Sequence, residues 1–175
     1  MSLANEGKPQ EFNIRIITHL TMTYLQKSKL TIKGSNHVAS VFLALLALED
    51  KIDQEKEHFY VMHLDVKSRV KLVELVSMGT LNASLVHPRE TFRRAIIAGS
   101  ASIIVAHNHP SGEVEPSDED TETTKMLFEA GTLLGIHLFD HVIFTNDKFF
   151  SFRENKAGEI TGKLTNTKLQ KKGGD

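Results

Sequence analysis

A short apolar run at residues 102–106 constrains the fold of this chain more than any other feature. It lacks the polar alternation of a strand with one solvated face, so it is typical of a strand buried on both faces of a sheet. A loop rich in proline and glycine follows over residues 108–116, and Ser117 then precedes a segment with helical spacing. A strand buried on both faces of its sheet, followed by a loop and a helix, indicates an α/β fold.

The remaining segments alternate in the same way between helical and extended patterns. Ser35 or Asn36 is suited to cap the second helix, and Pro88 suits the first position of the third. The patterns predict helices over residues 12–25, 35–48 and 88–98, and strands over residues 59–64, 69–76, 136–144 and 149–152. Hairpins occur beside crossovers, so we expect one α/β domain with a mixed β-sheet flanked by helices.

Composition limits the chemistry and the partners of the chain. There is no cysteine, so disulfides are excluded and a metal site would need imidazole and carboxylate ligands. No apolar stretch reaches the twenty or so residues of a membrane span, and no secretory signal begins the chain, so we expect a cytoplasmic protein. The formal net charge of −1 gives no support to direct DNA binding, and we expect the lysine-rich C-terminus to be a solvated end.

Three residues after the buried run carry the pattern of a metal centre. His107 and His109 are two apart at the end of a predicted strand, so both imidazoles point to the same face. Asp120 follows in the first turn of the next helix, from which its carboxylate can reach the same point. Two histidines and one carboxylate leave a fourth tetrahedral position open, as in catalytic rather than structural zinc sites.

A hydrolytic metal site also needs a base that is not itself a ligand. Glu57, at the start of a predicted strand, is the best placed candidate, with Glu74 and Asp65 as alternatives. Ser117 has two potential roles: its hydroxyl can cap the helix that carries Asp120, or it can donate a hydrogen bond to a developing oxyanion. The sequence leaves the choice between these roles open.

Structural explanations compete for the same residues. Two of nine histidines can fall two apart by chance, and Ser117-x-x-Asp120 is close to a capping box, which needs no metal. His63, His137 and His141 alternate with apolar neighbours on predicted strands, where a hydrogen-bonded structural histidine is the commoner outcome.

Taken together, the motifs resemble a known family. The order H-x-H, P, S-x-x-D with an upstream glutamate resembles the JAMM (MPN-type) metalloprotease signature. The string His107-Asn108-His109-Pro110-Ser111-Gly112, preceded by Gly79-Thr80-Leu81 and by Val86-His87-Pro88-Arg89-Glu90, is similar more specifically to the RadC branch. The resemblance implies an αβα layering like that of cytidine deaminases. It also implies zinc on His107, His109 and Asp120, a general base at Glu57, and the family's serine at Ser117.

The resemblance also implies a function and a domain organisation. We expect a zinc-dependent hydrolase of peptide or isopeptide bonds, although iron, cobalt or nickel also suit these ligands. The alternative is a DNA-repair-associated accessory protein with a weakly active or inactive metal site. Longer RadC proteins carry a helix-hairpin-helix region, whereas here we expect an N-terminal helical extension over 1–34, the domain over 35–153 and a flexible polar tail over 154–175. The sequence is compatible with a homodimer.

Overall fold

The computed structural model describes residues 14–17, 22–25, 30–79 and 86–161 of the chain. Its centre is a six-stranded sheet with the strand order β4-β3-β5-β6-β7-β8. The strands are β3 (Glu57–Leu64), β4 (Val70–Gly79), β5 (Ser102–Asn108), β6 (His137–Phe144), β7 (Lys148–Ser151) and β8 (Lys156–Glu159). Only β5 and β6 pair in parallel within this sheet, which is therefore mixed, as predicted.

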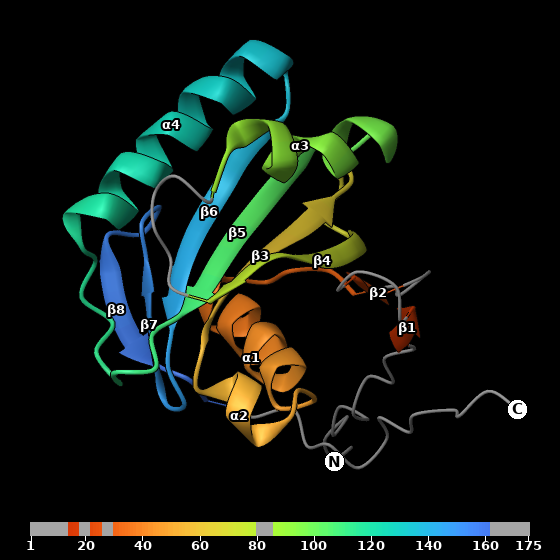
Figure 1. Cartoon of the computed structure of the whole chain (residues 1–175). Helices are drawn as coiled ribbons and strands as arrows, with labels where there is room; N and C mark the ends of the chain where they lie inside the picture. Colours follow the sequence, from red (N-terminus) through yellow and green to blue (C-terminus); the bar gives the residue numbers. More distant parts are fainter. Residues whose placement is uncertain (1–13, 18–21, 26–29, 80–85, 162–175) are drawn as a thin grey trace, which may run out of the picture.

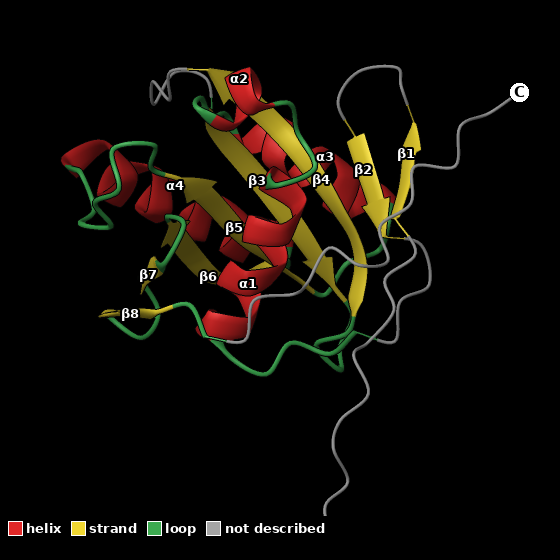
Figure 2. Ribbon diagram, turned by 90° about the horizontal axis from the view of Figure 1, so that it is seen from below, coloured by secondary structure: helices red, strands yellow, loops and turns green. Residues whose placement is uncertain are grey.

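Helices cover both faces of the sheet (Figures 1 and 2). They are α1 (Ser35–Leu46), α2 (Lys51–Gln54), α3 (Pro88–Ile97) and α4 (Asp118–Leu134). Along β3, Tyr60 and Met62 belong to the core beneath α1, whereas Phe59 and Val61 belong to the core beneath α3 and α4. This alternation confirms a single α/β domain with two helical layers around one sheet. In the part of the chain described, no helix has both the length and the apolar character that crossing a bilayer requires.

Strand β5 lies inside the sheet, between β3 and β6. Its residues 103–106 are fully buried, which confirms the expectation from the apolar run. The strand extends two residues beyond the predicted end, because its parallel pairing with β6 continues until Asn108 lies opposite Phe144. The metal-ligand motif thus begins within a strand fixed from both sides.

The helix predicted over residues 12–25 is wrong. The described parts of this segment are two antiparallel strands, β1 (Ile14–Ile17) and β2 (Met22–Leu25). The reason lies in its β-branched isoleucines and threonines, whose restricted side chains favour extended backbone over helix. The rest of residues 1–29 lies outside the described residues.

The predicted cap of α1 is also wrong. Gly34 occupies the N-cap position, and no side chain there accepts a hydrogen bond from the helix. Ser35 instead donates to Asp140 Oδ2 at 2.9 Å and is 2.7 Å from Glu154 Oε1. Its hydroxyl joins α1 to distant segments, so it is not available as a local cap.

The sheet continues past the expected end of the domain. Strand β8 pairs antiparallel with β7 inside the segment predicted to be a tail from residue 154 onward. Residues 162–175, with the lysine cluster Lys163, Lys168, Lys171 and Lys172, lie outside the described residues.

Candidate metal centre

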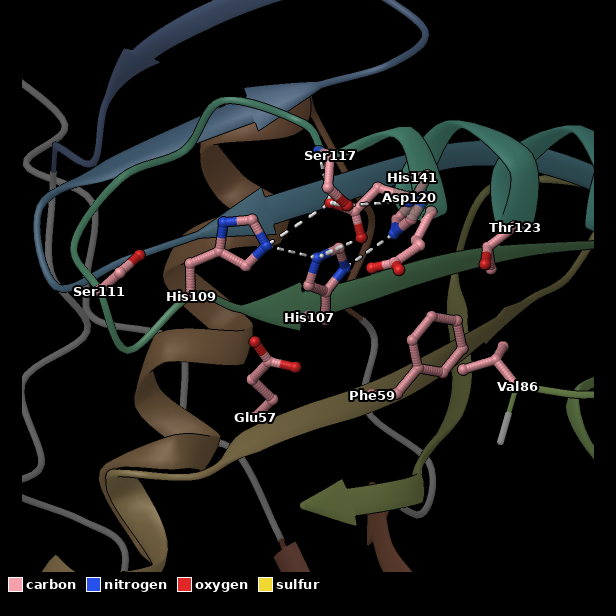
Figure 3. A pocket seen from close by; sticks show the side chains of 11 residues that line it. Glu57, Phe59, Val86, His107, His109, Ser111, Ser117, Asp120, Thr123 and His141 are labelled. Atoms are coloured by element: carbon pink, nitrogen blue, oxygen red, sulfur yellow. Dashed lines mark hydrogen bonds and ion pairs between the residues drawn. The ribbon is translucent and has the colours of Figure 1, made fainter. Parts of the chain in front are cut away.

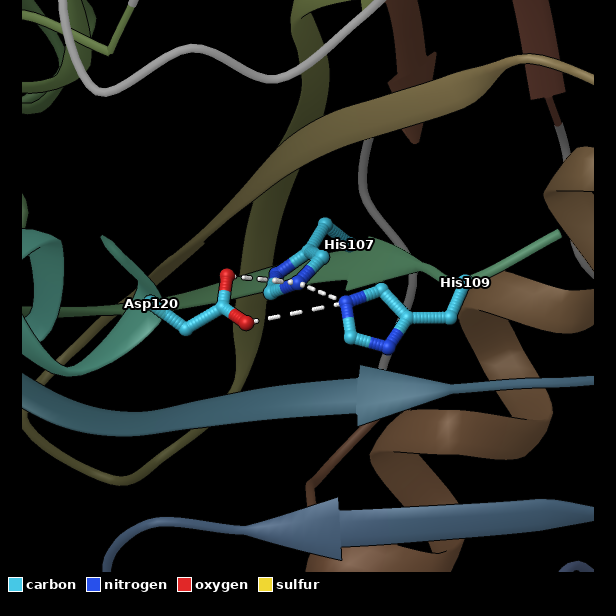
Figure 4. Close-up of side chains that lie close together, drawn as sticks. All are labelled: His107, His109 and Asp120. Carbon is cyan, nitrogen blue, oxygen red and sulfur yellow. Dashed lines mark hydrogen bonds and ion pairs between the residues drawn. The ribbon is translucent and has the colours of Figure 1, made fainter. Parts of the chain in front are cut away.

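His107, His109 and Asp120 converge where β5 ends and α4 begins (Figure 4). His107 Nε2 lies 2.9 Å from His109 Nε2 and 3.0 Å from Asp120 Oδ1, and His109 Nε2 lies 3.6 Å from Asp120 Oδ2. His107 is buried, and Asp120 is only 9% exposed. The strand, the loop and the returning helix therefore bring the three predicted side chains to one point.

The proton on His109 points away from this cluster. Its Nδ1 lies 2.8 Å from the carbonyl oxygen of Glu113, which can only accept, so Nδ1 donates and the neutral ring presents an Nε2 lone pair. Burial lowers the pKa of His109, but its hydrogen bonds to Asp120 and Glu113 outweigh that effect and raise the pKa overall. The surroundings of His109 thus stabilise a positive charge on its imidazole.

The carboxylate of Asp120 takes part in both the helix cap and the ligand cluster. Oδ2 accepts from the backbone N–H of Ser117 at 2.8 Å and from its hydroxyl at 2.7 Å, while Ser117 Oγ accepts from the N–H of Asp120. This is a capping box at the start of α4. Oδ1 faces His107 Nε2, and Oδ2 also lies 3.6 Å from His109 Nε2. Burial raises the pKa of Asp120, but the hydrogen bonds of His107 and His109, the charge of His107 and the hydrogen bond of Ser117 together hold it well below the usual value.

The spacing of the three side chains fits one small cation. Ligand atoms that each lie about 2.0–2.1 Å from one tetrahedral ion are about 3.3 Å apart. Here the two Nε2 atoms are 2.9 Å apart, His107 Nε2 is 3.0 Å from Asp120 Oδ1, and His109 Nε2 is 3.6 Å from Asp120 Oδ2. Two imidazoles and an ionised carboxylate are also ligands that divalent transition metals accept. His107, His109 and Asp120 could therefore bind a metal ion.

Glu57 lines the same cavity, which has a volume of about 250 Å³. Figure 3 shows its carboxylate pointing toward the two histidines from the start of β3. Asn108 ties the backbone on both sides of Glu57, because its side chain accepts from His58 N at 2.7 Å and donates to Lys56 O at 2.9 Å. The middle residue of the H-N-H string thus fixes the strand that carries the predicted base.

The two alternative bases lie elsewhere. Glu74 is buried on β4, 3.0 Å from His63 Nε2 and 3.8 Å from Arg94 Nε. Asp65 accepts two backbone hydrogen bonds in the turn between β3 and β4. Neither lines the cavity beside His107 and His109, so the structure brings only Glu57 of the three candidates to the cluster.

Several cavity residues carried no functional signal in the sequence. Phe59, Val86 and Thr123 line the cavity beside the ligands. His141, interpreted from the sequence as a structural histidine, also lines it and lies 2.9 Å from His107 Nδ1 through its Nε2. Burial, followed by the charge of His107, lowers the pKa of His141 well below its usual value. Sequence periodicity could not show this contact, because it depends on the parallel pairing of β5 with β6.

A family model described as "RadC-like JAB domain" matches residues 32–157 of the chain. Among similar proteins, a UPF0758 protein of Pelodictyon phaeoclathratiforme is 52% identical over 103 residues, which cover 59% of this chain and 46% of the relative. A UPF0758 protein of Desulforudis audaxviator is 48% identical over 108 residues, which cover 62% of this chain and 47% of the relative.

UPF0758 protein CT0611 of Chlorobaculum tepidum aligns over more of the chain. It is 42% identical over 151 residues, covering 85% of this chain and 66% of the relative. The chain spans about half the length of the first two relatives and about two thirds of the third. The names of these relatives state no activity, substrate or ligand.

Proposed function

The chain belongs to the family of RadC-like JAB domains, and from that premise we propose that it is a zinc-dependent hydrolase of peptide or isopeptide bonds. One observation carries the proposal: Nε2 of His107, Nε2 of His109 and the carboxylate of Asp120, all of them potential metal-ligand groups, face one another at 2.9–3.6 Å. Lone pairs packed so closely repel one another unless a positive charge lies among them, and a divalent cation supplies it. A bound zinc ion would supply a Lewis acid and lower the pKa of water at the site.

Glu57 is the general base in this proposal. Its carboxylate faces the two histidines across the cavity (Figure 3) without belonging to the three-residue ligand cluster. From that position it can take a proton from water and pass it to the leaving amine of an amide bond. Asn108 holds the backbone around Glu57 in register with β5, so base and ligands keep their relative position.

Two apolar residues of the cavity bind and orient the substrate. Phe59 and Val86 present an apolar wall beside the ligands, against which an aliphatic part of the substrate packs. The hydroxyl hydrogen of Ser117 is directed at Asp120 Oδ2, so its first task is to hold that carboxylate. Its predicted role as an oxyanion donor would require the hydroxyl to turn away from Asp120.

The test separates a hydrolase from a metal-binding platform. Glu57→Gln keeps the size of the side chain and removes the base. We expect it to retain zinc while cleavage of a dye-quenched peptide, or of a branched peptide joined through a lysine ε-amide, falls by about 100-fold or more. Glu55→Gln, an exposed neighbour before β3, is the matched control and should cleave like the wild type. Equal rates for Glu57→Gln and the wild type would contradict the proposal.

A further inference from the structure

A chain of hydrogen bonds begins at His107 Nδ1, the ring nitrogen that points away from the ligand cluster. His107 Nδ1 is 2.9 Å from His141 Nε2, and His141 Nδ1 is 2.6 Å from Thr124 Oγ1. Thr124 Oγ1 in turn lies 2.6 Å from the backbone carbonyl oxygen of Asp120. The side chain of Asp120 meets the other ring nitrogen of His107, Nε2, at 3.0 Å. Two of the three ligand residues are thus joined through β6 and α4.

The donor and acceptor capacity of each group determines which atom carries the hydrogen in each hydrogen bond of this chain. The carbonyl oxygen of Asp120 can only accept, so the single hydroxyl hydrogen of Thr124 is donated to it. Thr124 Oγ1 must then accept from His141, which places a hydrogen on His141 Nδ1. The tautomer of His141 is therefore set by the backbone carbonyl of Asp120, two hydrogen bonds away through Thr124.

The same reasoning assigns the hydrogen in the bond between His141 and His107. His141 is 1% exposed, and its two ring nitrogens meet His107 and Thr124 and not a carboxylate, so an imidazolium there would be costly. In the neutral ring, a hydrogen on Nδ1 leaves Nε2 as an acceptor, and His107 Nδ1 donates to it. His107 Nε2 then carries no hydrogen and presents its lone pair to His109 and Asp120.

We propose that His141, supported by Thr124, is a positioning residue that fixes the ring orientation and the metal-competent tautomer of His107. The inference rests on the proposed metal centre and extends it to residues outside the ligand set. Partners of this kind orient metal-ligating histidines and typically change metal affinity when they are lost. Here the partner is a second histidine, whose own tautomer is imposed by Thr124.

The hydrogen bond can be separated from the packing of the His141 ring. That ring stacks on Phe152 with centroids 4.9 Å apart and meets the edge of Phe59 at 6.1 Å. A phenylalanine at position 141 preserves these aromatic contacts and removes only the acceptor and the donor. Glutamine loses the stacking but offers an oxygen that can accept from His107.

The first experiment measures zinc affinity by competition with a chromophoric chelator. We expect His141→Phe to bind zinc about 10–100-fold more weakly than the wild type, His141→Gln to recover part of that loss, and Thr124→Val to show a smaller loss. His63→Phe is the matched control, because His63 is fully buried on β3 but pairs with Glu74 instead of the cluster. Wild-type zinc affinity in folded His141→Phe would overturn the proposal.

The second experiment needs no variant and no activity. In the wild-type chain with isotope-labelled histidine, metal-free and zinc-loaded, NMR should show a hydrogen on His107 Nδ1 and a coupling across the hydrogen bond to His141 Nε2. A hydrogen on His141 Nε2, or an unprotonated His107 Nδ1, would overturn the proposal even if His141→Phe failed to fold. Absence of zinc binding or hydrolysis would instead refute the proposed function, while the metal-free spectrum still reports on His141.

Discussion

At the scale of single residues, Asp120 shows how a capping residue can also be a metal ligand. The sequence presented capping and metal binding as competing explanations, because both use the same carboxylate. In the structure both occur together: Oδ2 closes the capping box with Ser117 and lies 3.6 Å from His109 Nε2, while Oδ1 faces His107. The capping box therefore orients the ligand instead of withdrawing it from the site.

Ser117→Ala tests this arrangement. The substitution removes the hydroxyl that accepts from the N–H of Asp120 and donates to its carboxylate. We expect the free energy of unfolding, measured by urea denaturation, to fall by about 0.5–2 kcal/mol. Ser111→Ala, an exposed serine in the preceding loop, is the control and should change stability little. An unchanged midpoint for Ser117→Ala would show that the capping box does not stabilise α4.

The sequence predicted the three ligand candidates because their spacing is local. The period of two along β5 and the short loop to α4 are enough to bring His107, His109 and Asp120 together. Asn108 and His141 could not be assigned in this way, since their partners are residues brought close by pairing with β3 and β6. Roles that depend on strand order are absent from local patterns.

At the scale of elements, α4 carries Asp120 and must sit closely against the sheet. Gly131 allows this approach: a Cβ there would lie 2.5 Å from the carbonyl oxygen of Ile136 and 3.1 Å from Phe92 Cζ. The helix ends soon afterwards at Gly135, which has a φ of 68° in the left-handed region. The missing side chain at Gly131 thus sets how closely α4 packs on α3 and the start of β6.

Gly131→Ala should therefore destabilise the fold. The overlap costs about 1–3 kcal/mol, and the better helix propensity of alanine offsets at most about 1 kcal/mol. We expect a lower midpoint of thermal unfolding. Thr132→Ala, one position along and exposed, should be neutral or slightly stabilising. A Gly131→Ala variant as stable as Thr132→Ala would contradict this account of the packing.

The elements differ in how far the sequence determined them. The helix α4 and the strand β5 were predicted because a cap and a continuous apolar run are local signals. The strands of the N-terminal segment were not predicted, because its apolar residues fall near helical spacing and this pattern was given more weight than its β-branched residues. Strand β8 was not predicted because it is short and polar, and its place in the sheet depends on pairing with β7.

At the scale of the whole molecule, Asp140 joins segments that are far apart in the chain. Its buried carboxylate accepts from the hydroxyls of Ser35 and Ser151 and from the backbone N–H of Arg153. These contacts link the start of α1 to β6, to β7 and to the turn after it. Burial raises the pKa of Asp140 above its ordinary value of 3.8, although these hydrogen bonds partly oppose the effect.

The raised pKa of Asp140 predicts the sign of a pH dependence. Between pH 3.8 and the raised pKa, the folded state binds more protons at this carboxyl than the unfolded state does. The contribution of Asp140 to the free energy of unfolding is therefore fully present below pH 3.8 and is lost as pH rises through the raised pKa. Asp120, whose pKa is lowered, contributes to the free energy of unfolding in the opposite sense: its contribution is present above the ordinary pKa of 3.8 and is lost as pH falls below it.

Asp140→Asn checks this assignment. The variant has no carboxyl to titrate, so its free energy of unfolding, followed by urea denaturation across this pH range, should lack the downward slope that Asp140 contributes. The comparison concerns the slope and not the absolute stability, because an amide cannot accept every hydrogen bond that the carboxylate accepts. Parallel pH profiles for the variant and the wild type would contradict the assignment to Asp140.

The central claim is that His107, His109 and Asp120 together bind one divalent cation, and metal analysis tests it most directly. After incubation with zinc and dialysis, the wild type should hold about one zinc ion per chain, and His109→Ala well below one. His137→Ala, which removes an exposed histidine at the start of β6, should match the wild type. Equal zinc content in His109→Ala and the wild type would contradict the claim.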